Sequence, residues 1–332
     1  RMMKEILTAS KLDDEKRLKE IFSMTKTRLQ DRFLSAGHSA AALRAMSYKS
    51  PISKFKDTTN GIEYYQNIRE MEEHFDEKKE EIISGLKALS ELLFRKGNVM
   101  ISYTASREGL AVLEEEIGSL KEALYPERMP ESRCILHCEK KNEGFKTSSK
   151  VQFAAKAGNF IDAGEEYNGA LQILKVIMSY EYLWINIRVK GGAYGCMSNF
   201  NRIGEGYFVS YRDPNLGRTL EIYDGVPEYL ENFTVSERDM TKYIIGTISN
   251  KDVPRTPQMQ GSISKTAYFS NVTEDMLQKE RNQILGAQKE DIQKLAALVE
   301  AVLSDDQICV VGSETAIEKA EDVFMEVKPL IG

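Results

Sequence analysis

The sequence has few of the residues from which metal sites and disulfide scaffolds are built. Its 332 residues include only 4 cysteines and 3 histidines. So few cysteines argue against a disulfide-rich secreted domain and favour a reducing compartment, either the cytoplasm or an organelle matrix. The sequence also lacks a run of 18 apolar residues, so we expect no membrane span.

The start of the sequence lacks the pattern of a signal peptide, a charged region followed by an apolar one. The first residues, RMMKEILTASKLDDEKRL, already read as a helix in mid-course. We therefore expect the chain to begin inside a larger protein.

The charge balance argues against nucleic acid or an anionic membrane as the main partner. The formal net charge is −6, whereas phosphate binding needs a basic face. Hydrophobic residues make up 42% and charged residues 29%, which is ordinary for a globular protein. The length is sufficient for two domains with a sizeable core.

Several catalytic signatures are missing. The glycines between Gly191 and Gly195 have neither the spacing of the dinucleotide fingerprint nor that of the P-loop. There is no G-x-S-x-G nucleophile elbow and no H-x-x-E-H zinc motif. A nucleotide-binding protein that uses this glycine loop is therefore the weakest hypothesis, and only detectable nucleotide binding would revive it.

The histidines and cysteines do not form a predicted metal site. His74 lies in a charged helical run without the second histidine that a helical zinc motif needs. Alternation along a strand would place His137 on the face opposite Cys134 and Cys138, and a fourth ligand is missing. His38 has no acidic or cysteine partner at ligand spacing, so we interpret it as a capping or packing residue. We predict no metal ligand in this chain.

Apolar periodicity predicts an α+β fold. Residues 1–96 read mostly as helices, a strand is predicted at Asn98–Thr104, and a helix follows at 106–124. The predicted strands of the second half are Val151–Ala157, 196–202, 207–212 and Ile308–Gly312, and helices fill most of the remainder. Prolines at 126 and 130 and a polar run at 139–150 suggest a domain boundary. Strand-turn-helix units at matching places in the two halves suggest two related domains.

One stretch combines residues suited to chemistry. Tyr182–Gly195 reads YLWINIRVKGGAYG and carries the only tryptophan, Trp184. Arg188 and Tyr194 flank Gly191–Gly192, a joint where the backbone can adopt dihedrals closed to other residues. Two donors on one loop could stabilise an anionic transition state or hold a peptide carbonyl. The apolar residues of this segment are predicted to belong to the core: Leu183, Trp184, Ile185 and Ile187.

This stretch resembles the C-terminal half of the pitrilysin/insulinase (inverzincin) zinc metallopeptidases, and most closely the presequence-protease subfamily. The resemblance rests on RVKGGAYG followed by SYRDPN, and extends to AKAGNF, YNGAL, HSAAALRA and GIEYY. It covers nearly the whole chain. It implies two related two-layer domains, each a mainly antiparallel sheet packed with helices, of which the first is incomplete. Residues 1–130 would be part of the third peptidase domain, 131–150 a linker, and 151–332 the fourth domain.

The resemblance also implies a function. Such enzymes enclose unfolded peptides in a chamber between two halves and hold zinc in the N-terminal half. The C-terminal half contributes an Arg and a Tyr, here Arg188 and Tyr194, which would bind the substrate carbonyl and stabilise the oxyanion. The zinc ligands would lie outside this chain, on the N-terminal half of the same protein or on a partner chain.

The sequence departs from the family pattern because it contains no H-x-x-E-H motif. We therefore expect this chain neither to bind catalytic zinc nor to cleave peptides alone. The alternative is a non-catalytic structural or peptide-binding subunit of a two-chain relative. The presence of both Arg188 and Tyr194 favours the half-enzyme, because an inactive subunit need not keep both.

Overall fold

The computed structural model describes residues 2–126 and 134–331. Their α-helices are α1 (Met2–Ala9), α2 (Glu15–Ser47), α3 (Pro51–Asn60), α4 (Ile62–Glu73), α5 (Phe75–Leu93), α6 (Arg107–Glu122), α7 (Ala170–Tyr180), α8 (Leu216–Asp224), α9 (Val226–Glu231), α10 (Glu237–Lys251), α11 (Pro257–Phe269), α12 (Glu274–Leu285), α13 (Lys289–Gln293), α14 (Leu295–Ser304) and α15 (Glu314–Lys319). The strands are β1 (Glu143–Thr147), β2 (Phe153–Asn159), β3 (Gly195–Phe200), β4 (Glu205–Tyr211), β5 (Gln307–Ser313) and β6 (Glu326–Pro329). The short helical turns are η1 (Lys96–Asn98), η2 (Ile161–Ala163), η3 (Trp184–Val189) and η4 (Glu321–Val323).

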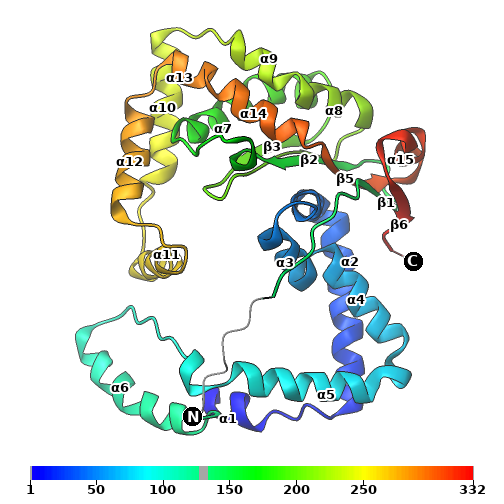
Figure 1. The fold of residues 1–332 in the computed structure, drawn as a ribbon, viewed down its shortest axis with the longest axis vertical. Coiled ribbons are helices and arrows are strands. Elements are labelled where there is room, and N and C mark those ends of the chain that lie inside the picture. The colour runs from blue at the N-terminus through cyan, green and yellow to red at the C-terminus, as the bar shows by residue number, and fades with distance from the viewer. Residues whose placement is uncertain (1, 127–133, 332) are drawn as a thin grey trace. The chain divides into compact units, whose positions relative to one another are not determined.

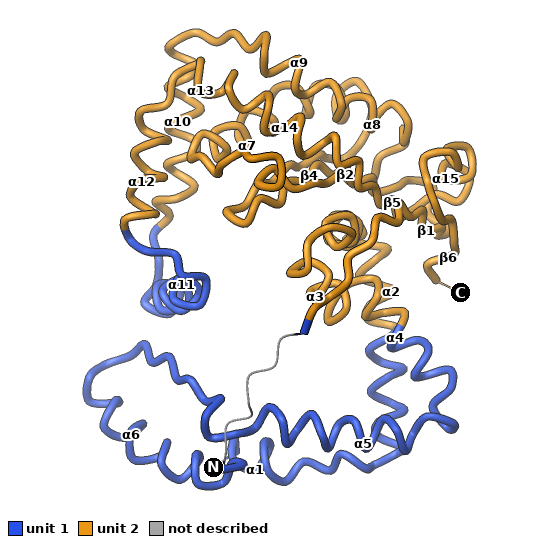
Figure 2. The backbone as a smooth tube through the Cα atoms, in the orientation of Figure 1, with its two compact units in different colours: residues 1–26, 67–134, 254–274 blue, residues 27–66, 135–253, 275–332 orange. Residues whose placement is uncertain are grey.

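The chain divides into two compact units, coloured separately in Figure 2. Unit 1 comprises residues 1–26, 67–134 and 254–274, and unit 2 comprises residues 27–66, 135–253 and 275–332. Each unit is therefore assembled from separate stretches of the sequence. The passage between residues 134 and 135 falls within the predicted linker.

Unit 2 contains a six-stranded sheet with the order β3-β4-β2-β5-β1-β6. The neighbours from β3 to β5 pair antiparallel, whereas β1 pairs parallel with both β5 and β6. The sheet is therefore mixed. The α+β class predicted from the sequence is confirmed in this coarse form.

Both faces of the sheet are covered by helices. Figure 1 shows α7, α8 and α14 over one face, with α2 and α3 on the other. Side chains alternate along a strand, so Ile308 and Val310 of β5 pack into the first core, and Cys309 and Val311 into the second. Burial on both faces explains why the whole of β5 is buried.

A glycine lets α2 approach the sheet closely. A Cβ atom at Gly37 would lie 2.4 Å from a ring carbon of Phe153 on β2. The preceding residue, Ala36, has non-helical dihedrals (φ −135°, ψ 36°), so the helix is kinked there. The sequence had suggested a glycine break followed by a separate alanine-rich helix; instead α2 continues to Ser47.

Three details of the sequence-based fold were wrong. Asn98–Thr104, predicted as a strand, begins in η1 and continues as irregular chain. Residues Glu143–Thr147, which were assigned to the linker, form β1 inside the sheet. The last strand, β6, was not predicted. Among the described residues before Glu143, strand pairing is limited to an isolated bridge between Arg95 and Tyr125, so a second sheet is not seen there.

Unit 1 is almost entirely helical and has little core of its own. Among its described residues, the buried apolar side chains are Ile68, Phe75 and Leu124. Many large apolar side chains on its helices are exposed, including Leu89 and Leu93 of α5 and Val112 of α6. None of the helices in the described part of the chain combines the length and apolarity needed to cross a membrane.

Candidate functional site

The candidate site lies in unit 2, where the chain passes from α7 into β3 through a wider helical turn. Residues Trp184–Val189 form a π-helix, in which the amide of Lys190 donates to the carbonyl of Ile185 at 2.9 Å. Single π-turns of this kind occur frequently at functional sites. Leu183 and Ile187 are buried beneath the turn, as predicted.

The turn directs its other side chains outward. Ile185 is 37% exposed, so its predicted place in the core was wrong. Trp184 is only partly buried, rather than a core residue. The exposed face of the tryptophan ring instead supports Arg188.

Arg188 is exposed but held in place by two contacts. Its guanidinium carbon lies 4.1 Å from the centre of the Trp184 ring, a cation–π geometry. Its Nη1 donates a hydrogen bond of 2.5 Å to the backbone carbonyl of Tyr194. The first predicted site residue is thereby bonded to the backbone of the second, and its remaining donors face solvent.

Tyr194 presents its side chain to solvent from the end of the same loop. The residue is 66% exposed. Its amide donates to the carbonyl of Tyr211 at 3.0 Å, which fixes the backbone to β4. Its hydroxyl makes no hydrogen bond with any residue that the structure describes. The structure therefore brings Arg188 and Tyr194 together on one loop, with free donors on both side chains.

The joint between them requires glycine. Gly192 has φ +80°, a left-handed conformation that costs little only for glycine. A Cβ atom at Gly191 would lie 2.4 Å from the carbonyl oxygen of Ile187. The amides of Gly192 and Ala193 donate to the carbonyls of Arg188 and Ile187 and so close the helical end.

A second segment, which the sequence predicts only as a turn, supports this joint. The side-chain amide of Asn215 donates to the carbonyl of Gly191 at 2.5 Å. Asn215 is itself held by Asp213, whose buried carboxylate accepts from the Asn215 amide at 2.8 Å and from the Thr219 hydroxyl at 2.5 Å. Burial raises the pKa of Asp213 above its ordinary value, although these hydrogen bonds oppose the shift. Asn215 lies 24 residues from Gly191, so no local pattern in the sequence signals this contact.

The other candidate residues have packing or surface positions. His38 packs against the rings of Phe153 and Tyr211, with centroid distances of 6.0 and 5.0 Å, and burial lowers its pKa. His74 is exposed, 3.5 Å from Glu77. Cys134 and His137 are also exposed. Among the described residues there is no group of three or more His, Cys, Asp or Glu side chains that could hold a metal ion.

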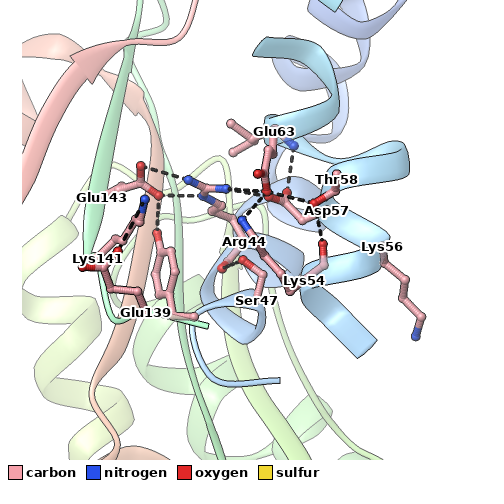
Figure 3. Close-up of polar contacts among 12 residues, drawn as sticks. Arg44, Ser47, Lys54, Lys56, Asp57, Thr58, Glu63, Glu139, Lys141 and Glu143 are labelled. Carbon is pink, nitrogen blue, oxygen red and sulfur yellow. Dashed lines mark hydrogen bonds and ion pairs between the residues drawn. The ribbon is translucent and has the colours of Figure 1, made fainter. Parts of the chain in front are cut away.

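A buried charge cluster in unit 2 connects the helices to the sheet (Figure 3). Arg44 of α2 binds Asp57 of α3 at 2.6 Å and Glu143 of β1 at 2.6 and 3.1 Å. Glu143 also accepts from the Tyr48 hydroxyl at 2.9 Å and pairs with Lys328 of β6 at 2.7 Å. Burial alone would raise the pKa of Glu143, but Arg44 and Lys328 outweigh it and lower the pKa to about 2. With every charge partnered, the cluster is an anchor between elements.

Comparison with known proteins identifies the family. Residues 142–314 match the family described as PreP C-terminal domain. Residues 1–71 match a second family, described as associated with the same subfamily of peptidases. The chain belongs to the presequence protease family. The first match alone covers more than half of the chain, including the whole Arg188–Tyr194 loop.

Individual relatives support the assignment to the presequence protease family. The chain is 38% identical to Protein HypA of Clostridium perfringens over 99% of this chain and 34% of HypA. It is 29% identical to the chloroplastic/mitochondrial Presequence protease 1 of Arabidopsis thaliana over 98% of this chain and 31% of that protein. The crystal structure of pitrilysin has the same fold, with a TM-score of 0.55 and 14% identity over 92% of this chain and 32% of pitrilysin. The chain spans about a third of the length of the curated relatives it matches.

Proposed function

We propose that this presequence protease chain is the substrate-binding and oxyanion-stabilising part of a zinc metalloendopeptidase that degrades unstructured peptides in an enclosed chamber. Arg188 and Tyr194 are its catalytic residues. The observation that carries the proposal is the pair of solvent-facing donors on one loop, with Arg188 fixed between Trp184 and the Tyr194 carbonyl.

These two side chains can act on a peptide carbonyl. When a carbonyl carbon becomes tetrahedral, negative charge develops on its oxygen, and prearranged donors stabilise that charge without reorganising. The guanidinium supplies a permanent positive charge and several N–H groups, and the phenol supplies one O–H. Loss of one such donor typically lowers kcat by about 10²–10³.

The residues described in this chain do not fit a catalytic zinc site. They include no cluster of three potential ligands, and the sequence has no H-x-x-E-H motif. We propose that the zinc ligands belong to a part of the protein outside these residues, on the same polypeptide or on a partner chain. The short coverage of the relatives and the exposed apolar side chains of unit 1 support such a partner.

We also retain the proposed organisation into part of a third peptidase domain at 1–130, a linker at 131–150 and a fourth domain at 151–332. The family matches at 1–71 and 142–314 support a division between these regions. All four cysteines are free, which supports a reducing compartment, the cytoplasm or an organelle matrix.

The test uses the full-length protein and an unstructured peptide. We expect Arg188→Ala and Tyr194→Phe each to lower kcat by about 10²–10³, because each removes a transition-state donor. Zinc content, measured by elemental analysis, should not change. Tyr180→Phe is a matched control, because Tyr180 is 67% exposed and lies outside the loop. Arg218→Ala, on the exposed surface of α8, is the control for arginine.

Unchanged kcat in both site variants would refute the assignment of Arg188 and Tyr194. A full-length protein that binds peptide but neither holds zinc nor cleaves peptide would instead establish the alternative, a non-catalytic peptide-binding subunit.

A further inference from the structure

We propose that Arg212 is a specificity-determining residue that binds a carboxylate of the peptide held at Arg188 and Tyr194. The inference rests on the proposed peptide-binding function and adds a substrate preference to it. Its basis is the position of Arg212, the conformation of its backbone and the absence of a partner for its guanidinium among the described residues.

Arg212 lies beside the candidate catalytic tyrosine. It directly follows β4, whose last residue, Tyr211, pairs with Gly195 at the start of β3. The guanidinium carbon of Arg212 is 5.9 Å from the centre of the Tyr194 ring and 5.8 Å from that of Tyr211. A peptide that reaches the Tyr194 hydroxyl would therefore pass close to this guanidinium.

The backbone of Arg212 is held in a conformation that most residues avoid. Its φ is +49°, in the left-handed region that favours glycine. The conformation is fixed from both sides. Before it, the Tyr211 carbonyl accepts from Tyr194, and after it, Asp213 exchanges two backbone hydrogen bonds of 2.8 and 3.0 Å with Gln152. Strain of this kind tends to occur at ligand-binding sites, and an arginine where glycine would fit better suggests that the side chain is needed.

The donors of Arg212 are free. The residue is exposed and forms neither a hydrogen bond nor an ion pair with the described residues. Arg202, in contrast, pairs with Glu280, and Arg44 is enclosed by carboxylates. The carboxylate next to Arg212 in sequence, Asp213, is buried and already accepts from Asn215 and Thr219. An acidic partner for Arg212 therefore has to come from a ligand.

A carboxylate is the ligand group that suits this geometry. The planar guanidinium can donate two parallel hydrogen bonds to the two oxygens of one carboxylate. The ring contacts of Arg212 lie near the outer limit of about 6 Å for a cation–π interaction, so they orient the side chain without using its donors. The carboxylate could belong to a glutamate side chain or to the C-terminus of the peptide.

The experiment measures peptide binding to the metal-depleted full-length protein, so that cleavage does not interfere. One peptide series replaces each Glu by Gln in turn, and a second pair differs only in a free or amidated C-terminus. We expect the wild-type protein to bind one acidic member about tenfold more tightly than its neutral counterpart, as for a charge-assisted hydrogen bond. In Arg212→Gln this ratio should fall to about one. Arg212→Lys should retain part of it, and Arg218→Gln, a matched loss of charge on the exposed surface of α8, all of it.

Arg212→Gly separates recognition from structure. Glycine adopts a positive φ without strain, so this variant should melt at the same temperature as the wild type or higher, yet lose the acidic preference. Equal ratios in the wild-type protein and in Arg212→Gln would overturn the proposal. A preference that remains intact alongside failed cleavage would refute the proposed peptidase function alone.

Discussion

The two units differ in how they bury apolar surface. In unit 2 the sheet has a core on each face, and the largest fully buried side chains come from strands and helices on both sides. In the described residues of unit 1, only Ile68, Phe75 and Leu124 are buried apolar side chains. Unit 1 even contains a cavity of about 930 Å³ lined by residues of α1, α5 and the segment 123–126.

This difference indicates which unit can be stable by itself. Burial of apolar surface is the main favourable contribution to folding, so unit 2 has the means to hold its own structure. Unit 1 leaves large apolar side chains exposed in numbers that mark an interaction surface. We therefore expect unit 1 to depend on contacts with polypeptide outside these residues, whereas the Arg188–Tyr194 loop is supported from within unit 2.

The largest expected effect is in hydrogen exchange. In the isolated chain of 332 residues, amides of β2 and β5 should exchange slower than those of α5 and α6 by a factor on the order of 10³ or more, because exchange follows the local free energy of opening. In the full-length protein the helices of unit 1 should gain protection. Equal protection of α5 and β5 in the isolated chain would show that unit 1 needs no partner.

The next effect concerns charge. Unit 2 buries Glu143 between Arg44 and Lys328, whereas ion pairs of unit 1, such as Lys19–Asp76, are exposed and contribute little. The pKa of Glu143 is about 2 in the folded protein, below its ordinary value of 4.5. Its stabilisation is therefore complete above about pH 5 and lost as the pH falls towards about 2, a change of about 3 kcal/mol.

Urea unfolding followed by the fluorescence of Trp184, which lies in unit 2, measures this loss. Glu143→Gln should flatten the fall in stability between about pH 5 and about pH 2.5. Glu326→Gln is the control, because Glu326 pairs with the same Lys328 at 2.8 Å but is exposed. Burial raises the pKa of Asp57, which acts in the opposite direction, so the informative quantity is the difference between wild type and variant. An unchanged slope in Glu143→Gln would contradict the assignment.

A smaller effect is expected at Asn215, which supports the glycine joint through the Gly191 carbonyl. Asn215→Ala should lower kcat of the full-length protein about tenfold, because a shifted loop misplaces the donors of Arg188 and Tyr194. Peptide affinity and melting temperature should change little. Equal losses of stability and activity would instead indicate a purely structural role.

The features that could be predicted from the sequence are those that depend on local pattern. Alternating or continuous apolar runs marked β2, β3, β4 and β5, and a resemblance-bearing motif placed Arg188 and Tyr194 on one loop. The strand β1 was missed because EGFKT is polar and glycine-containing, and β6 because EVKP contains proline. Their burial or pairing comes from neighbours distant in sequence.

The remaining errors have the same origin. Asn98–Thr104 has the composition of a strand, but no neighbouring strand is found among the described residues of unit 1. Asn215 and Arg212 were missed because their partners, Gly191 and Tyr194, are brought near only by the β3–β4 hairpin. Contacts across a sheet edge carry no periodic signal along the chain.

The central claim is that Tyr194 donates to the substrate oxyanion, and single-turnover cleavage by the full-length protein tests it most directly. We predict that Tyr194→Phe cleaves an unstructured peptide about 10²–10³ times more slowly than Tyr180→Phe, with the same zinc content. If the two phenylalanine variants cleave at the same rate, Tyr194 is not an oxyanion donor and its proposed catalytic role is wrong.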